Sequence, residues 1–287
     1  MKCAICFSGL TRSVECCMPS ILENFILPLN ADVFIHTWDI NQVSTDIRFN
    51  TFPAFSTVTR DEFFEDFKKK CPSKFILEVE KYSNGWNFKN QTSEGNSVPM
   101  FYSIYKANEL KQKEEDISGE RYDLVVRMRF DCLYENGLST EEVETVVGDS
   151  DVIYVRANRT YKSTYGQQSR NNFILENTTE PYVSDMFAFG NSENMDIYSS
   201  TYLHLNVIME NISGAKARKC AETYLGYNLF NNDIDVKIAS NKFSFSGYYG
   251  ESGKVSYSVL GPIDWEGRQL IFESDYEEGR KLHGIVV

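Results

Sequence analysis

The stretch at residues 122–134 (YDLVVRMRFDCLY) constrains the fold more than any other part of the chain, because it alternates regularly and then ends in charge. Its apolar positions share one face of a predicted strand: Leu124, Val126, Met128 and Phe130. The other face begins apolar at Val125 and continues with Arg127, Arg129 and Asp131. Such a strand can be buried only if its charged end lies beside a crevice, which is where open α/β sheets bind ligands.

The charged end of this strand is typical of a phosphate site. Two neighbouring guanidinium groups, here Arg127 and Arg129, repel each other unless an anion lies between them, and their planar geometry suits phosphate oxygens. Asp131 could hold a hard divalent cation against the same phosphates. In the alternative interpretation, Asp131 only pairs with Arg129, and both are solvated at the end of the strand.

Composition limits the class of protein. The 287 residues suffice for one large α/β domain, alone or with a smaller addition, and a formal charge of −12 argues against a nucleic-acid partner. No apolar run is long enough for a membrane span, and the apolar start at residues 1–7 is expected to be a first strand rather than a signal peptide. Seven cysteines, an odd number without framework spacing, indicate a reducing compartment, so we expect a cytoplasmic protein.

The N-terminal region has the pattern of a nucleotide-binding α/β unit. A strand at residues 2–8 ends at Gly9, a helix runs from Val14 until Pro28 closes it, and a second strand covers residues 32–37. Neither GxGxxG nor GxxxxGKS/T is present, so dinucleotide redox chemistry and P-loop phosphoryl transfer lose support. His36, within the second strand, is predicted to be a satisfied core histidine.

Further elements complete an α/β chain with an α+β end. Helices are expected at residues 59–70, 97–110, 138–147 and 215–228, and strands at residues 74–81 and 151–155. The charged segment 111–116, which extends the second of these helices to Gly119, is predicted to be solvated. Residues 243–259 alternate around a glycine-containing turn at residues 250–253, which predicts a hairpin.

Two acidic residues are candidates for chemistry outside the central strand. Asp185 begins an otherwise apolar strand at residues 183–190, where an acid could act as a general base or bind a sugar hydroxyl. The alternative is an ordinary residue of the turn that leads into this strand. Glu222 lies on the last predicted helix.

Five segments, in this order, resemble a family of glycosyltransferases: KCAICFSGLTRS, ADVFIHTWD, VPMFYSIYKANELK, YDLVVRMRFD and VSDMFAFGNSENM. Members occur in bacterial polysaccharide gene sets and in large viruses and phages, and they are similar to the GT-A group. The resemblance covers residues 2–202, and the order of the segments is more distinctive than any single motif. It implies one GT-A-like (Rossmann-like) domain at residues 1–287. That domain would have a mixed sheet flanked by helices, with a nucleotide-sugar-binding core at residues 1–200 and an α+β acceptor-side portion at residues 201–287.

The resemblance implies transfer of a sugar from a nucleotide-diphosphate sugar to a hydroxyl of a glycan acceptor. GT-A enzymes usually hold Mn²⁺ or Mg²⁺ against the donor diphosphate with an Asp-x-Asp at the end of a central strand. Here the corresponding residues are Arg129, Phe130 and Asp131, so only the second acid is present as a metal ligand. Arg127 and Arg129 would then supply part of the positive charge that stabilises the leaving diphosphate.

The same resemblance assigns residues to the donor and to the acceptor. The donor-binding residues are expected in the turns after the first two strands: Gly9, Thr11, Arg12 and Asp39. Gly9 would let the backbone approach the nucleotide closely, and Asp39 would bind the base or the ribose. Asp185 is the first candidate for the base that deprotonates the acceptor hydroxyl, and Glu222 is the second.

Two other classes of protein fit the same residues. A catalytically inactive glycan-binding protein on the same scaffold would account for the incomplete acid pair. Another group transferase with an anionic nucleotide donor, such as a sulfotransferase, would need a phosphate-cradling loop after the first strand. Residues 8–13 (SGLTRS) are a weak version of such a loop.

Overall fold

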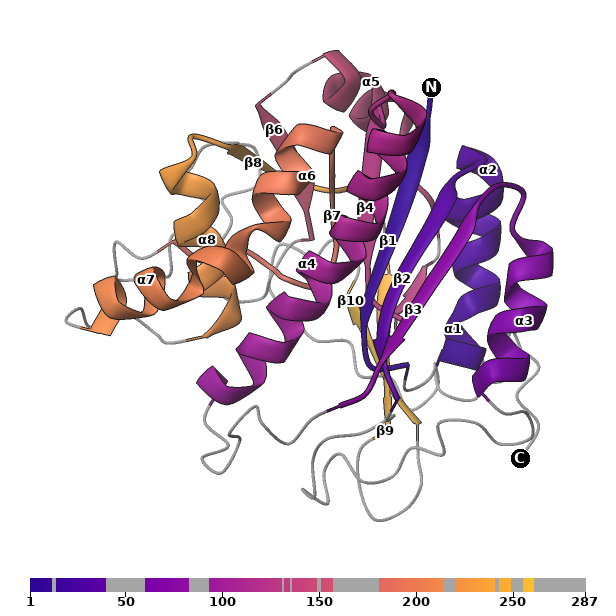
Figure 1. The fold of residues 1–287 in the computed structure, drawn as a ribbon, viewed down its shortest axis with the longest axis horizontal. Coiled ribbons are helices and arrows are strands. Elements are labelled where there is room, and N and C mark those ends of the chain that lie inside the picture. The colour runs from indigo at the N-terminus through magenta and orange to yellow at the C-terminus, as the bar shows by residue number, and fades with distance from the viewer. Residues whose placement is uncertain are drawn as a thin grey trace.

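The computed structural model describes residues 1–11, 14–39, 60–82, 93–130, 132–134, 136–148, 151–156, 181–213, 220–240, 243–248 and 255–260. Its centre is a seven-stranded mixed sheet of order β3-β2-β1-β4-β7-β6-β8 (Figure 1). The strands are β1 (Cys3–Gly9), β2 (Asp32–Trp38), β3 (Phe75–Glu80), β4 (Leu124–Met128), β6 (Val152–Val155), β7 (Ala188–Gly190) and β8 (Asp235–Ile238). Only β7 runs against its neighbours, while the other strands of this sheet are parallel. The expected mixed, Rossmann-like α/β sheet is therefore confirmed.

Helices cover both faces of the sheet, as the two-sided apolar strands require (Figure 1). The first face packs against α1 (Val14–Ile21), the π-helical turn η1 (Leu22–Ile26), α3 (Arg60–Lys70) and α5 (Thr140–Gly148). The second face packs against α4 (Ser93–Ser118), α6 (Ser192–Ser199), α7 (Thr201–Ser213) and α8 (Ala221–Asn231). Leu124, Val126 and Met128 of β4 lie in the first core and Val125 lies in the second, which confirms the predicted alternation.

The strand order reverses between β1 and β4. From β1 the chain moves outward through β2 to β3, and α4 then returns it to β4 on the other side of β1. Open α/β sheets bind their ligands at such a switch point, outside the carboxyl ends of the strands. The residues that end β1 and β4, including Gly9 and Arg127, therefore stand where this fold class carries its sites.

The prediction of one long strand at residues 122–134 is wrong in the length of the strand. It divides into β4 and β5 (Cys132–Tyr134), and β5 pairs with β9 (Phe243–Tyr248) in a separate sheet of order β10-β9-β5. Pairing explains the division, because β1 reaches only Met128 and β7 reaches only Arg127. Beyond these residues, none of the described strands of the main sheet pairs with this part of the chain. The predicted hairpin is confirmed, since β9 pairs with β10 (Val255–Leu260) in antiparallel fashion.

The helix expected to close at Pro28 continues through α2 (Leu27–Leu29). Pro28 is tolerated there because it lies in the first turn of α2, where the absence of a backbone N–H costs little hydrogen bonding. The helical run ends at Asn30, whose left-handed backbone has φ 46° and whose N–H donates to the Leu27 carbonyl at 3.2 Å. An asparagine in this conformation is an ordinary helix terminator.

The prediction that residues 111–116 are solvated holds for Lys113 and Asp116, which are exposed, and is wrong for three buried residues of the same segment. Lys111 has 0% of its surface exposed, and Glu114 and Glu115 each have 6%. Lys111 Nζ lies 3.1 Å from Glu115 and 2.8 Å from Asp196 of α6, and it donates to Ser192. The charged segment is buried because α6 supplies partners that the sequence of α4 does not reveal.

Candidate functional site

The guanidinium group of Arg127 is buried on β4, with 2% of the residue exposed. Nη1 donates to the backbone carbonyl of Asp185, and Nη2 lies 3.3 Å from the hydroxyl of Ser8 at the end of β1. Nε is buried and has no hydrogen-bond partner among the described residues. None of the ion pairs in the described part of the chain includes Arg127. Burying a cation against neutral oxygens alone is costly, so the position favours an anionic ligand.

A second polar group without a partner faces the same region. Tyr198 of α6 is fully buried, and its hydroxyl makes no hydrogen bond within the described residues. Burial raises the pKa of this hydroxyl, the negative charge of Asp185 adds to that effect, and the positive charge of Arg127 opposes it. Tyr198 therefore lies within electrostatic reach of both groups and offers a further donor there.

Two more arginines lie at the same edge of the sheet as Arg127. Arg129, one residue beyond β4, is half-buried, and Arg156 follows the carboxyl end of β6 with 7% exposed. The pKa of Arg156 is lowered to about 10, mainly by burial and in smaller part by the positive charge of Arg129, while Asp185 acts in the opposite direction. The structure thus places three cationic side chains at the carboxyl ends of two parallel strands, β4 and β6, with β7 between these strands. We refer to Arg127, Arg129 and Arg156 as the arginine cluster.

Arg156 is the site residue that the sequence analysis missed. Its local signal resembles that of the central strand, because the apolar run DVIYV at residues 151–155 ends directly in arginine. In space, β7 lies between β4 and β6, and its antiparallel direction brings Asp185 to the same edge of the sheet. The strand order that makes this arrangement is not visible in the sequence.

Asp185 and Glu222, the two candidate bases, lie near each other. Asp185 precedes β7 by three residues instead of beginning it, and 8% of it is exposed. Its segment is joined to α8 by a hydrogen bond of 2.9 Å from the Val183 N–H to the Glu222 carbonyl. The close contact depends on Gly226, where an added Cβ would lie 2.9 Å from Pro181.

The carboxyl group of Glu222 has an altered proton affinity. Burial raises its pKa, and the negative charge of Asp185 raises it further, while hydrogen bonds with Cys220 and Tyr182 act in the opposite direction. A carboxylate with a raised pKa takes up a proton more readily, which is what a general base requires. Acids perturbed by burial and by a like charge are also common at functional sites.

The expected donor-binding turn is partly described. Gly9 has φ +106°, its N–H donates to Ser103 Oγ at 2.8 Å, and its carbonyl accepts from Thr37 at 2.8 Å. An added Cβ would meet nothing within 4 Å, so glycine is required here for its backbone conformation rather than for tight packing. Thr11 is buried, and its carbonyl accepts from the Val14 N–H at 2.9 Å. Arg12 lies outside the described residues.

Asp39 has a local structural contact. It is exposed just beyond β2, and its carboxylate accepts from the Tyr82 N–H at 2.7 Å, while its own N–H donates to the Glu80 carbonyl at 2.9 Å. Asp39 therefore secures the ends of β2 and β3. The strand β1 lies between it and the arginine cluster. Asp131, the predicted metal ligand, lies outside the described residues.

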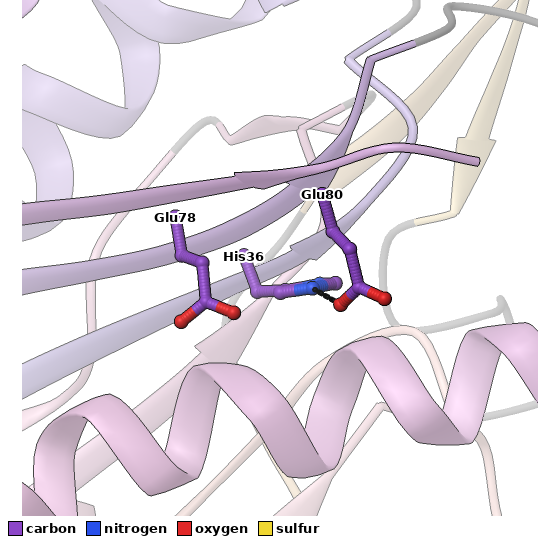
Figure 2. Close-up of side chains that lie close together, drawn as sticks. All are labelled: His36, Glu78 and Glu80. Atoms are coloured by element: carbon purple, nitrogen blue, oxygen red, sulfur yellow. Dashed lines mark hydrogen bonds and ion pairs between the residues drawn. The ribbon is translucent and has the colours of Figure 1, made fainter.

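His36 forms a third group of polar side chains, with Glu78 and Glu80 on the neighbouring strand (Figure 2). Its Nδ1 lies 2.9 Å from Ser103 Oγ, and its Nε2 lies 3.2 Å from Glu80 Oε2. Burial lowers its pKa, and the hydrogen bond with Glu80 opposes this change. Both ring nitrogens thus have partners, as the prediction of a satisfied core histidine requires. One ligand atom from each of the three side chains lies within 4.8 Å of the others, a separation that could hold a metal ion.

The structure defines an α/β protein with a Rossmann-like mixed sheet and a buried arginine, Arg127, at the end of β4 beside its switch point. Comparison with protein-family models and with curated proteins yields no match to this chain. Among the residues that the structure describes, none of the helices combines the length and apolar character needed to cross a membrane.

Proposed function

We propose that this protein is a glycosyltransferase that moves a sugar from a nucleotide-diphosphate sugar to a hydroxyl of a glycan acceptor. The observation that carries the proposal is Arg127, a buried cation at the switch point whose described partners are neutral oxygens, with Arg129 and Arg156 at the same edge of the sheet. A diphosphate would supply the missing negative charge. The resemblance of the ordered segments to GT-A-like glycosyltransferases favours a nucleotide sugar as its source.

The arginine cluster would act on the leaving group. As the bond between the anomeric carbon and the diphosphate oxygen breaks, the bonding electrons pass to the diphosphate and its charge grows. Guanidinium groups that are already in place stabilise this charge without reorganising. Arg127 is fixed by Asp185 and Ser8, so it would hold the phosphate position, and the half-buried Arg129 would close over it.

An acid beside the cluster would act on the acceptor. The acceptor oxygen bonds to the anomeric carbon and loses its proton, which Asp185 or Glu222 would accept. Asp185 remains the first candidate because its own backbone carbonyl binds Arg127, which places it next to the proposed phosphate site. The raised pKa of Glu222 also suits a group that accepts this proton, so both carboxylates are substituted in the experiment below.

A divalent cation, Mn²⁺ or Mg²⁺ on Asp131, remains part of the proposal. With only one acid of the usual pair in the sequence, the arginine cluster would carry much of the charge compensation. Donor binding should then depend on the arginines and keep a measurable part of its strength when EDTA is present.

The catalytic proposal is tested by nucleoside diphosphate release from a panel of UDP, GDP and CDP sugars, with and without glycan acceptors. We expect the protein to release the nucleoside diphosphate from one of these donor sugars. Asp185→Asn should lower turnover far more than it weakens donor binding, because a base acts in the chemical step. Equal losses of turnover and donor binding would show that Asp185 is not the base. Glu222→Gln tests the second candidate base in the same way. If no donor is turned over, the transferase proposal fails and a glycan-binding scaffold becomes the better account.

A further inference from the structure

The side chains of His36, Glu78 and Glu80 converge from two neighbouring parallel strands. His36 of β2 stands opposite Glu78 of β3 in the register, and Glu80 follows two residues later on the same face. Figure 2 shows the two carboxylates on either side of the imidazole, with that of Glu80 facing a ring nitrogen. Their ligand atoms lie within 4.8 Å of one another. The strands that hold them are part of the main sheet, so strand pairing fixes their backbone positions.

The hydrogen bonds around Ser103 bear on which nitrogen of His36 carries the proton. Ser103 Oγ accepts from the Gly9 N–H at 2.8 Å, and its single proton has two acceptors, the His36 carbonyl at 3.2 Å and Nδ1 at 2.9 Å. When the proton goes to the carbonyl, Nδ1 must donate to Ser103. The lone pair of Nε2 then faces the carboxylate of Glu80 across 3.2 Å. Two acceptors at this distance need a proton or a metal ion between them.

We infer that His36, Glu78 and Glu80 form a binding site for a divalent transition-metal ion of the Zn²⁺ or Mn²⁺ class. The 3.2 Å between Nε2 and Oε2 suits the edge of a coordination shell, because ligands about 2.0–2.2 Å from a tetrahedral ion lie about 3.3–3.5 Å apart. One imidazole and two carboxylates are ligands that Zn²⁺ and Mn²⁺ accept, whereas Mg²⁺ and Ca²⁺ prefer oxygen alone. The remaining positions would hold water.

The surroundings of the site support metal binding. The Nδ1 hydrogen bond to Ser103 fixes the ring, and the Tyr102 hydroxyl donates to Glu80 at 2.9 Å, so two ligands already have orienting partners. Lys106 lies 3.5 Å from Glu78 and 2.7 Å from Glu109. When a metal ion binds Glu78, Lys106 therefore keeps an acidic partner. The side chain of Glu80 is 36% exposed and that of Glu78 is 35% exposed, so an ion can enter from solvent.

The proposed metal site would also stabilise the turn after β1. Ser103 joins His36 to the Gly9 N–H, and Ser8 beside Gly9 contacts Arg127. A metal ion that fixes the tautomer of His36 would thus hold the end of β1 in place. This inference depends on different residues from the proposed function and stands whether or not the arginine cluster binds a nucleotide.

The test is calorimetric titration of the EDTA-treated, dialysed full chain with Zn²⁺ and with Mn²⁺. One ion per chain is expected. Glu78→Gln and Glu80→Gln should each weaken binding by at least about 10-fold, and Glu109→Gln, a carboxylate next to the site, is the matched control. Circular dichroism of each variant establishes that it is folded. Folded wild-type protein that takes up neither ion, or binding that survives in both variants, would overturn the inference.

Nitrogen NMR of wild-type protein gives a second readout that needs no variant. The chain has three histidines, so the resonances of His36 can be assigned by comparison with substitutions of the other two. Zn²⁺ should shift the Nε2 resonance of His36 and leave Nδ1 protonated. A His36 ring that keeps its proton on Nε2 in the presence of Zn²⁺ would contradict the site, since that nitrogen would be donating to Glu80.

Discussion

Two buried cations on the same face of the sheet have opposite surroundings. Lys111 is fully buried near the C-terminal end of α4, where two carboxylates, Glu115 and Asp196, lie 3.1 Å and 2.8 Å from its Nζ. Arg127 is buried at the carboxyl edge of the strands, and its described partners are a carbonyl and a hydroxyl. The helix α4 spans both edges of the sheet. Its residue Ser103 bonds Gly9 at the carboxyl edge, and Ser118 bonds Lys2 at the amino edge.

From this difference we infer that Lys111 is a structural charge and that Arg127 is a charge available to a ligand. Around Lys111 the charges are balanced within the protein, and Arg121 adds a second cation at 2.6 Å from Asp196. Around Arg127 a buried nitrogen and a nearby buried tyrosine hydroxyl have no partner among the described residues. On this face of the sheet, the buried lysine is therefore fully paired, whereas Arg127 forms no ion pair with the described residues although it lies at the edge where this fold class binds ligands.

Loss of the balanced cation should have the largest effect on stability. Lys111→Met leaves Glu115 and Asp196 buried close together, and breaking a buried pair in this way typically costs about 3–5 kcal/mol. Urea denaturation of the variant measures the change. Lys113→Met, on the exposed side of the same helix, is the control and should change the free energy of unfolding by less than about 0.5 kcal/mol. Similar values for the two variants would show that Lys111 is not a structural charge.

Ligand binding should stabilise the folded protein through the other cation. At a concentration of about 100 times its Kd, a nucleoside diphosphate should add about 2.7 kcal/mol to the free energy of unfolding. The gain should persist in Lys111→Met, because that residue lies at the other edge of the sheet, and should vanish in Arg127→Met. Thermal melts with and without the nucleotide measure this gain in stability for both variants. Loss of the gain in Lys111→Met would show that the two edges are coupled and weaken the comparison.

Removal of the unbalanced cation should cost less stability than removal of Lys111. Arg127→Met gives up two hydrogen bonds, to Asp185 and Ser8, and relieves the burial of a charge, so we expect a change within about 1–2 kcal/mol in either direction. Urea denaturation beside Lys111→Met makes the comparison direct. If Arg127→Met is destabilised by as much as Lys111→Met, Arg127 has a structural role and the comparison fails.

The smallest predicted effect concerns pH. Because its pKa is raised in the folded protein, protonated Glu222 contributes stability that is fully present below the ordinary pKa of 4.5 and is lost as the pH rises through the raised pKa. Glu222→Gln should remove this dependence, so the variant should gain stability relative to wild type as the pH increases above 4.5. Melting temperatures between about pH 4 and pH 8 measure the difference. A difference that stays constant over this range would show that Asp185 and burial do not perturb Glu222.

Local patterns predicted most of the elements, but α7 and β8 were not predicted, and the strand expected at residues 183–190 is only β7. Long-range packing accounts for the site residues that local patterns missed. The alternation around Arg127 correctly placed the apolar residues of β4 on two faces, and the capping box of α5 is visible in Ser139 and Glu142, which bond each other's backbone N–H at 3.2 Å. Arg156 was missed because an antiparallel strand inserted between β4 and β6 brings it to the site. The burial of Lys111 was missed because Asp196 lies 85 residues further along the chain.

The central claim is that the arginine cluster binds a nucleoside diphosphate. The most direct measurement is calorimetric titration with UDP, GDP, CDP and adenosine 3′,5′-bisphosphate, first with Mn²⁺ and then with EDTA. Arg129→Ala is compared with Arg121→Ala, an exposed arginine near Asp196 that lies outside the cluster. We predict that one nucleoside diphosphate binds and that Arg129→Ala weakens it by at least about 10-fold, while Arg121→Ala binds as wild type does. Preference for the bisphosphate would indicate a sulfotransferase-like donor, and the absence of binding by any of the four nucleotides would contradict the account.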